Sequence, residues 1–144
     1  MQLLPTTPSD RLLCRDGDHA VAEHFEEAVL LWPDGRFIMG DFYGHPSCAI
    51  INHKGSWCLA GGEGLIVCFF EDGLPSGPSS PDPARIETRK LWRDDNPPPD
   101  GKQMWFVEGA WFYTDDLVRV VVNPLAPEAG LYEVDVRTLA WRRL

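Results

Sequence analysis

Short apolar runs alternate with turn-forming residues along most of this chain. The segments between the runs carry the glycine, proline, aspartate and asparagine residues that favour turns, as in Pro33-Asp34-Gly35. Strands are expected at residues 28–32, 37–43, 49–52, 57–60, 65–70, 85–92, 103–107, 109–113, 117–122 and 131–136, followed by a last apolar segment at 139–144. Because strands joined by short turns pair with their neighbours in sequence, the pattern predicts an all-β antiparallel meander of about nine or ten short strands, arranged as a twisted sheet, a sandwich or a partly open barrel.

A glycine-x-aromatic unit occurs three times, at residues 35–41, 55–61 and 109–115. In each copy an aromatic residue stands two positions after the glycine, and another apolar run lies thirteen positions after it. This spacing is typical of hairpins with aromatic cross-strand packing, and it invites comparison with β-propeller blades of about 40 residues. It groups residues 28–70 into one blade-like sheet and 85–122 into a second. The chain is too short for a closed propeller of about four or more blades, so a smaller assembly of hairpins is expected.

The N-terminal residues are less regular than the rest. Residues 1–17 carry prolines and an Asp-Gly pair and are expected to form a loosely packed lead-in. In residues 18–27, Val21 and Phe25 fit one face of a helix with Asp18 as its N-cap, and they fit one face of a strand equally well. The sequence leaves these two interpretations open and allows at most one short N-terminal helix.

Two polar segments interrupt the strands, and one strand is unusually apolar. Residues 72–84 contain four prolines and residues 94–101 contain three in succession, so both are expected to be exposed loops. In residues 117–122, Arg119 is the only polar side chain. That composition predicts a strand that is covered on both faces and central to its sheet.

The composition indicates one ordered domain over residues 1–144, because 44% of the chain is hydrophobic and 11% is aromatic. A chain of this length buries roughly 70% of the surface of its unfolded form, which is enough for a core without metals or disulfides. The formal charge is −9, which opposes binding to nucleic acid or to anionic membranes, since their phosphates attract lysine and arginine. The same charge suits association with a basic protein partner.

The four cysteines, at positions 14, 48, 58 and 68, form no Cys-x-x-Cys pair. The last three lie in apolar runs, so they are expected to be buried free thiols, as in a reducing cytoplasm. The N-terminus has no signal-peptide pattern, and every apolar run is far shorter than a membrane span. We therefore expect a soluble cytoplasmic protein.

Candidate catalytic and metal-binding groups are sparse. His45 and His53 can join Asp41 and Glu63 in a cluster only if their loops converge, and the chain has no short His-x-His spacing. It also lacks a Gly-x-Ser-x-Gly elbow, and Cys48 in an apolar strand is expected to have a raised pKa and an inert thiol. We expect neither an enzyme nor a metal or cofactor.

The loop that follows the strand at 85–92 is the most distinctive segment, because it combines a stiff proline run with acidic residues and flanking tryptophans. Such a loop loses little entropy on docking, and tryptophans commonly anchor interfaces. The residues expected to contact a partner are Trp92, Asp94, Asp95, Asp100, Glu108 and Asp115.

In overall composition the chain is similar to the immunity proteins of bacterial toxin–effector systems, which are small, acidic, cytoplasmic and rich in β-structure. The resemblance carries over no individual residue. It implies a protein that neutralises a toxin or effector by occluding its active site. The alternative is a β-barrel that binds or hydrolyses a small molecule in an aromatic-lined cavity. The cavity would be lined by Phe42, Trp57, Trp105 and Trp111.

Overall fold

The computed structural model describes residues 3–99, 105–123 and 129–144. Within these ranges the chain forms twelve β-strands and one short 3-10 helix, which confirms the predicted all-β antiparallel fold. The strands are β1 (Asp10–Asp16), β2 (His19–His24), β3 (Glu27–Trp32), β4 (Gly35–Asp41), β5 (Cys48–Asn52), β6 (Trp57–Gly62), β7 (Gly64–Phe70), β8 (Ile86–Leu91), β9 (Val107–Phe112), β10 (Leu117–Val122), β11 (Gly130–Asp135) and β12 (Trp141–Arg143), and the 3-10 helix is η1 (Pro83–Arg85).

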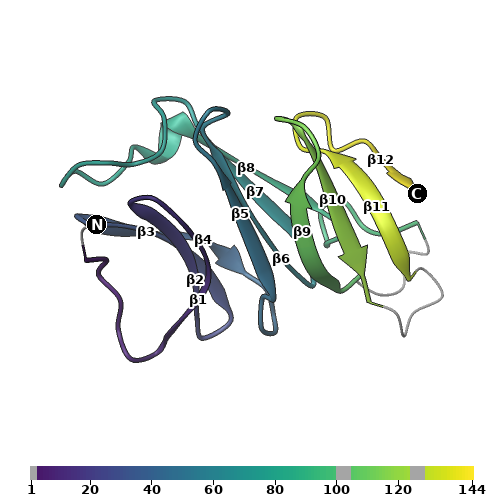
Figure 1. Ribbon diagram of the computed structural model, residues 1–144, viewed down its shortest axis with the longest axis horizontal. Coiled ribbons are helices and arrows are strands. Elements are labelled where there is room, and N and C mark those ends of the chain that lie inside the picture. Colours follow the sequence, from purple (N-terminus) through teal and green to yellow (C-terminus); the bar gives the residue numbers. More distant parts are fainter. Residues whose placement is uncertain (1–2, 100–104, 124–128) are drawn as a thin grey trace.

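The strands form three separate four-stranded sheets, in each of which consecutive strands pair antiparallel. The first sheet contains β1–β4, the second β5–β8 and the third β9–β12. Figure 1 shows the second sheet between the other two, with the first sheet on the N-terminal side and the third on the C-terminal side. Because each sheet is a meander, its first and third turns lie at one end of the strands and its second turn lies at the other.

The second sheet has a hydrophobic core on each of its faces. Successive side chains of a strand point to opposite faces, so β6 and β7 supply both cores, and every residue of these two strands is buried. The core shared with the first sheet contains Val21, Leu30, Trp32, Met39, Phe42, Cys58, Ala60, Ile66, Cys68 and Phe70. The core shared with the third sheet contains Trp57, Leu59, Leu65, Val67, Trp92, Trp105, Val118, Val120, Val122, Tyr132 and Val134.

The strand at residues 117–122 differs from its prediction in one respect. β10 is an interior strand of its sheet, as expected, but only Val118, Val120 and Val122 are buried. The alternate residues, including Arg119, are half-exposed because they point away from the second sheet. The strands that are covered on both faces include β6 and β7 of the second sheet and β2 and β3 of the first.

The N-terminal region contains more regular structure than the sequence suggests. Residues 10–16 form β1, so the expected lead-in contains a paired strand, although none of its residues is buried. Residues 19–24 form β2, and the helical alternative is therefore wrong. Val21 packs into the core while its neighbours pack on the opposite face of the sheet, which imposes the two-residue period of a strand. Phe25 and Glu26 adopt positive φ angles and form the turn into β3.

The glycine-x-aromatic copies mark hairpins but do not mark equivalent places in the three sheets. Phe37 lies in the fourth strand of the first sheet, Trp57 in the second strand of its sheet and Trp111 in the first strand of its sheet. The predicted grouping of residues 28–70 into one blade-like sheet is therefore wrong. The exposed loop at 72–84 joins β7 to β8 within one sheet, so a break in the strand pattern is not a boundary between sheets.

Candidate functional site

The turn between β5 and β6, residues 53–56, lies at the centre of one end of the molecule. The His53 ring stacks edge-on against His19, with centroids 5.0 Å apart, and its Nε2 lies 3.2 Å from the Asp16 carbonyl oxygen beside the β1–β2 turn. Lys54 Nζ lies 2.8 Å from a carboxylate oxygen of Asp115, in the turn between β9 and β10. Turns of all three sheets thus meet at this end, as the meander topology requires.

The β7–β8 loop extends the same end across the edge of the first sheet. The Pro75 carbonyl lies 2.6 Å from His19 Nε2, and the Gly77 carbonyl accepts a hydrogen bond of 2.9 Å from Trp32 Nε1. At the base of the loop, Arg85 forms a bidentate ion pair with Asp72. We call this end the turn surface: residues 16–18, 33–34, 53–56, 71–85, 113–116 and 135–140, with the strand residues that adjoin them.

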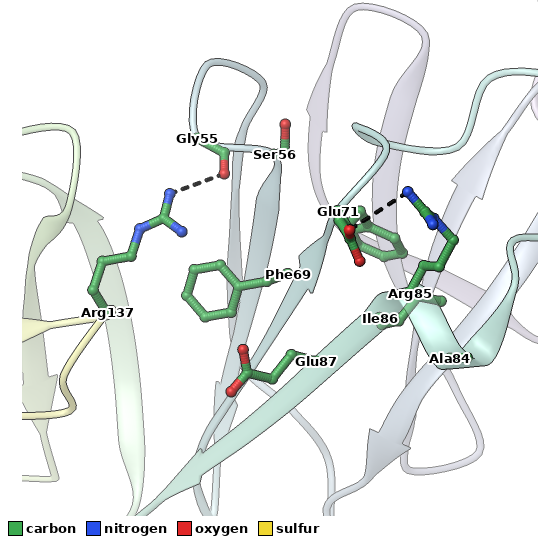
Figure 2. Close-up of a pocket in the computed structure, with 10 residues that line it drawn as sticks. Gly55, Ser56, Phe69, Glu71, Ala84, Arg85, Ile86, Glu87 and Arg137 are labelled. Atoms are coloured by element: carbon green, nitrogen blue, oxygen red, sulfur yellow. Dashed lines mark hydrogen bonds and ion pairs between the residues drawn. The ribbon is translucent and has the colours of Figure 1, made fainter.

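A groove opens on one side of the β5–β6 turn, between the second and third sheets, and has a volume of about 530 Å³. Figure 2 shows Phe69 at its centre, with Arg137 of the third sheet on one side and Glu87 of β8 near the ring. The guanidinium carbons of Arg137 and Arg89 lie 4.7 and 4.8 Å from the Phe69 ring centroid. Arg137 also donates a hydrogen bond to the Gly55 carbonyl, which joins the two walls.

A second groove of about 420 Å³ lies on the other side of the same turn. Its lining includes Phe112 and Tyr113, whose exposed fractions are 42% and 55%, and the carboxylates of Asp16 and Asp115. The ring of Trp57 is buried beneath the turn and contacts both Phe69 and Phe112, with centroid distances of 6.4 and 5.6 Å. The two grooves therefore share one aromatic floor.

Carboxylates greatly outnumber basic groups on the turn surface. The acidic residues are Asp16, Asp18, Asp34, Glu71, Asp72, Asp82, Asp115, Asp116 and Asp135. The basic residues are Arg15, Lys54, Arg85 and Arg137. The hydrogen bond with Arg85 lowers the pKa of Asp72, and the hydrogen bond with Asp115 raises the pKa of Lys54, so these groups are charged at neutral pH. With nine carboxylates and only four basic groups, this end is strongly negative.

The predicted contact residues are divided between the two ends of the molecule. Asp115 lies on the turn surface, exposed and paired with Lys54. Asp94, Asp95 and Glu108 are also exposed but lie at the opposite end. Asp100 lies outside the described residues.

Trp92 is fully buried, which corrects its prediction as a contact residue. It packs with Trp105, Tyr132 and Trp141, and all ring centroids in this group are 4.9 to 5.7 Å apart. The tryptophans flank the polar loop because they pack in the core between the second and third sheets, and they are not exposed anchors.

Arg93 is a buried residue that the sequence did not single out. Its two terminal nitrogens donate hydrogen bonds to the carbonyls of Glu63 and Asp41, at 2.5 and 2.7 Å, and its guanidinium lies 4.9 Å from the Phe42 ring centroid. Arg93 thereby joins the first and second sheets at the end opposite the turn surface, and it anchors the start of the acidic loop.

The four aromatic residues of the small-molecule alternative do not share a cavity. Phe42 belongs to the core of the first and second sheets, whereas Trp57 and Trp105 belong to the other core. Trp111 is 42% exposed on the outer face of the third sheet. Within the described residues, these four side chains therefore do not line one common space.

The candidate chemical groups lie apart from one another. His45 Nδ1 hydrogen-bonds to Glu23, whereas His53 contacts Asp16. Burial alone would raise the pKa of Glu23, but hydrogen bonds with His45 and Arg11 outweigh it and lower the pKa. Over residues 3–99, 105–123 and 129–144, no group of three or more histidine, cysteine or acidic side chains is placed to hold a metal ion.

The cysteines are all free, and burial raises the pKa of the Cys48 thiol to about 11, as the sequence analysis predicted for an inert thiol.

Among the described residues, no helix has the length and apolar character needed to cross a membrane. No protein family, curated protein or solved structure matches this chain. The candidate site therefore depends on the geometry and charge of the turn surface itself.

Sequence reasoning identified one member of the turn surface, Asp115, and missed the others. Phe69 and Phe112 look like ordinary strand residues, and they become groove residues only because neighbouring sheets diverge where the strands end. The signal that was available is the concentration of aspartate in the expected turns, at Asp16, Asp34 and Asp72. Topology is needed to place those turns at one end.

Proposed function

We propose that this chain is a non-catalytic binding protein that uses the turn surface to recognise a basic protein partner. The observation that carries the proposal is the coincidence, at one end, of surplus carboxylates with the partly exposed rings of Phe112 and Tyr113. Charge of one sign steers a partner of the opposite sign and raises the rate of association. Aromatic side chains in a partly desolvated groove supply the anchors that give affinity.

The rigidity of the turn surface supports this proposal. Asn52 Nδ2 donates a hydrogen bond of 2.7 Å to the Asp115 carbonyl, and Arg137 bonds to Gly55. These contacts fix the turns of the second and third sheets relative to each other before any partner arrives. A preorganised surface loses less conformational entropy on binding than a set of independent loops.

The specific role that we propose is that of an immunity protein, which neutralises a bacterial toxin or effector by covering its active site. A negative end with partly exposed aromatic rings suits a basic cleft that has evolved to hold an anionic substrate. The compositional similarity to immunity proteins and the charge distribution support this role. Neither identifies the toxin.

The test of binding is affinity capture from the native cytoplasm at low and high salt, using two variants with the same change of charge. Asp18→Lys/Asp115→Lys alters the turn surface, whereas Asp94→Lys/Asp95→Lys alters the opposite end. We expect the first variant to lose the captured partner and the second to retain it, with weaker capture of the wild type at high salt. Equal retention by both variants would remove the turn surface as the binding site.

The immunity role has its own test, because a binding protein need not protect a cell. The captured partner is produced from an inducible promoter in a bacterial host, with and without this chain. We expect growth to stop in its absence and to recover when it is co-produced, but not with the Asp18→Lys/Asp115→Lys variant. A captured partner that is harmless to the host contradicts the immunity role and leaves the binding proposal standing.

A further inference from the structure

The outer face of the third sheet, which points away from the second sheet, lacks a covering layer among the described residues. Val118, Val120 and Val134 point into the core, so the alternate residues of the same strands point outward. The outward set is Trp111, Leu117, Arg119, Val121, Leu131, Glu133, Asp135 and Arg142, as the strand register requires. Trp111 and Leu131 are each 42% exposed.

A row of side chains crosses this face over all four strands. Arg119 stands opposite Trp111 on one side and Glu133 on the other, and Glu133 stands opposite Arg142. Glu133 forms ion pairs with Arg119 at 3.6 Å and with Arg142 at 3.4 Å. Arg119 Nε and Glu133 Oε2 are nevertheless buried without a hydrogen-bond partner.

The charge of this face distinguishes it from the rest of the molecule. It carries two arginines, Arg119 and Arg142, and two carboxylates, Glu133 and Asp135, so it is neutral on a chain whose formal charge is −9. A basic partner gains no electrostatic advantage here. Two copies of this chain repel one another over most of their surfaces, but not where two neutral faces with both signs of charge meet.

The corresponding outer face of the first sheet is covered by the chain itself over its two central strands, β2 and β3. Ala20, Ala22, Val29 and Leu31 on that face are buried, and Leu4 packs against them. Arg36 donates a hydrogen bond of 2.9 Å to the Pro5 carbonyl, which holds residues 3–9 in place. The segment at residues 3–9 therefore stands in the way of a third sheet from a second copy, which disfavours head-to-tail growth.

We propose that the outer face of the third sheet is an interface between two copies of this chain, related by a two-fold axis. An isologous contact closes after two copies, and it covers the exposed Trp111 and Leu131 of each copy with the same face of the other. A face of four strands and six residues projects only about 400 Å², against the roughly 800 Å² that each partner contributes to a standard interface. The dimer is accordingly expected to be weak and to form at micromolar or higher concentrations.

The test is sedimentation of the full-length protein over a range of concentrations, with two matched variants. Leu131→Glu places a charge on the outer face of the third sheet, far from the turn surface. Ile38→Glu places the same charge on the outer face of the first sheet, where Ile38 is 55% exposed. We expect the wild type and Ile38→Glu to dimerise alike, and Leu131→Glu to raise the dimer dissociation constant at least about tenfold.

Self-cross-linking gives a second, independent readout. A Leu131→Cys variant is expected to form a disulfide-linked dimer on mild oxidation, and Ile38→Cys is expected to remain monomeric. A wild type that is monomeric at every concentration overturns the proposal, as does open-ended growth that both glutamate variants weaken. Because Leu131 lies outside the turn surface, failure of this test leaves the proposed partner binding untouched.

Discussion

Arg137 of the third sheet donates a hydrogen bond of 3.1 Å to the backbone carbonyl of Gly55 in the second sheet. The same side chain pairs with Asp116 and stacks on Phe69, so one exposed residue joins two sheets at the turn surface. We expect Arg137→Ala to lower the free energy of unfolding by about 1 kcal/mol, since a hydrogen bond and a cation–π contact are lost together. That change lowers Tm by roughly 2–4 °C in a domain of this size, measurable by thermal unfolding.

Arg142→Ala is the control for this measurement. Arg142 also pairs with a carboxylate, Glu133, but its side chain is 69% exposed and bonds to no carbonyl of another sheet among the described residues. Exposed ion pairs contribute about 0–1 kcal/mol. A larger loss of stability in Arg142→Ala than in Arg137→Ala would contradict the bridging role.

The buried guanidinium of Arg93 predicts a larger effect. Arg93→Met leaves the carbonyls of Asp41 and Glu63 without their donor, and each unsatisfied buried group costs about 1–3 kcal/mol. We expect the free energy of unfolding to fall by about 3 kcal/mol in denaturant titration. Arg89→Met, which removes an arginine that pairs with Glu87 and stacks on Phe69, is expected to cost less than about 1 kcal/mol. Similar losses in the two variants would show that the two carbonyl contacts contribute little.

Two glycines with positive φ angles differ in the space around them. At Gly64, with φ of +80°, an added Cβ would lie 2.7 Å from the Leu91 carbonyl oxygen and 2.8 Å from that of Trp92. At Gly17, with φ of +62°, nothing lies within 4 Å. We expect Gly17→Ala to cost about 1–2 kcal/mol from backbone strain alone, and Gly64→Ala to cost at least about 3 kcal/mol because β7 and β8 must separate. Equal costs in urea unfolding would mean that the backbone around Gly64 moves freely.

Acid should destabilise the protein through Asp10. The hydrogen bonds from Arg36 hold the pKa of the Asp10 carboxyl well below its ordinary value of 3.8. A carboxyl with a depressed folded-state pKa contributes stability that is fully present above its unfolded pKa and is lost as pH falls toward its folded pKa. We therefore expect stability to fall on acidification below about pH 4, and to fall less steeply in Asp10→Asn. An acid limb of the same slope in both proteins would exclude Asp10 as its source.

The thiols offer a check on packing that requires no mutation. Burial raises the pKa values of Cys14, Cys48 and Cys68 to about 11, and it raises that of Cys58 well above its ordinary value. Since only the thiolate reacts, alkylation at neutral pH should be slow in the folded protein and complete after denaturation. Mass spectrometry of modified peptides measures each site. Rapid native labelling of Cys58, the most deeply buried, would contradict the core between the first and second sheets.

The strand pattern was readable from the sequence because hairpins are local. Pro33-Asp34-Gly35 marks a turn regardless of what the neighbouring sheets do, and β10 was placed at its observed bounds. The division into sheets was not readable, since both the β7–β8 loop and the connection after Leu91 interrupt the pattern, and only the second separates two sheets. The segment of β2 was left open between a helix and a strand, because His19 to His24 is covered on both faces and shows no polar alternation. β1 was missed because the prolines before it and the Asp16-Gly17 pair at its end suggested irregular structure.

The candidate site was less accessible still. Asp115 could be proposed because it is acidic and follows an aromatic strand, but its partner Lys54 lies 61 residues away in sequence. Arg137, which bonds to the adjacent Asp116, lies 21 residues from it. Trp92 illustrates the opposite error: its neighbours are polar, yet its ring is enclosed by residues from the third sheet. Exposure depends on which sheets face each other, and that is a property of the assembled layers.

The double coverage of β6 and β7 has a consequence for cooperativity. The sheet in the middle of the sequence depends on one flanking sheet for each of its faces, so losing either flank exposes a complete apolar surface. Although a bridge between Glu63 and Phe106 joins the second sheet to the segment before β9, the sheets are held together mainly by their shared cores. They should therefore melt in a single transition, with neither the N-terminal nor the C-terminal third persisting as a folded fragment. The middle sheet makes the whole chain one unit of folding.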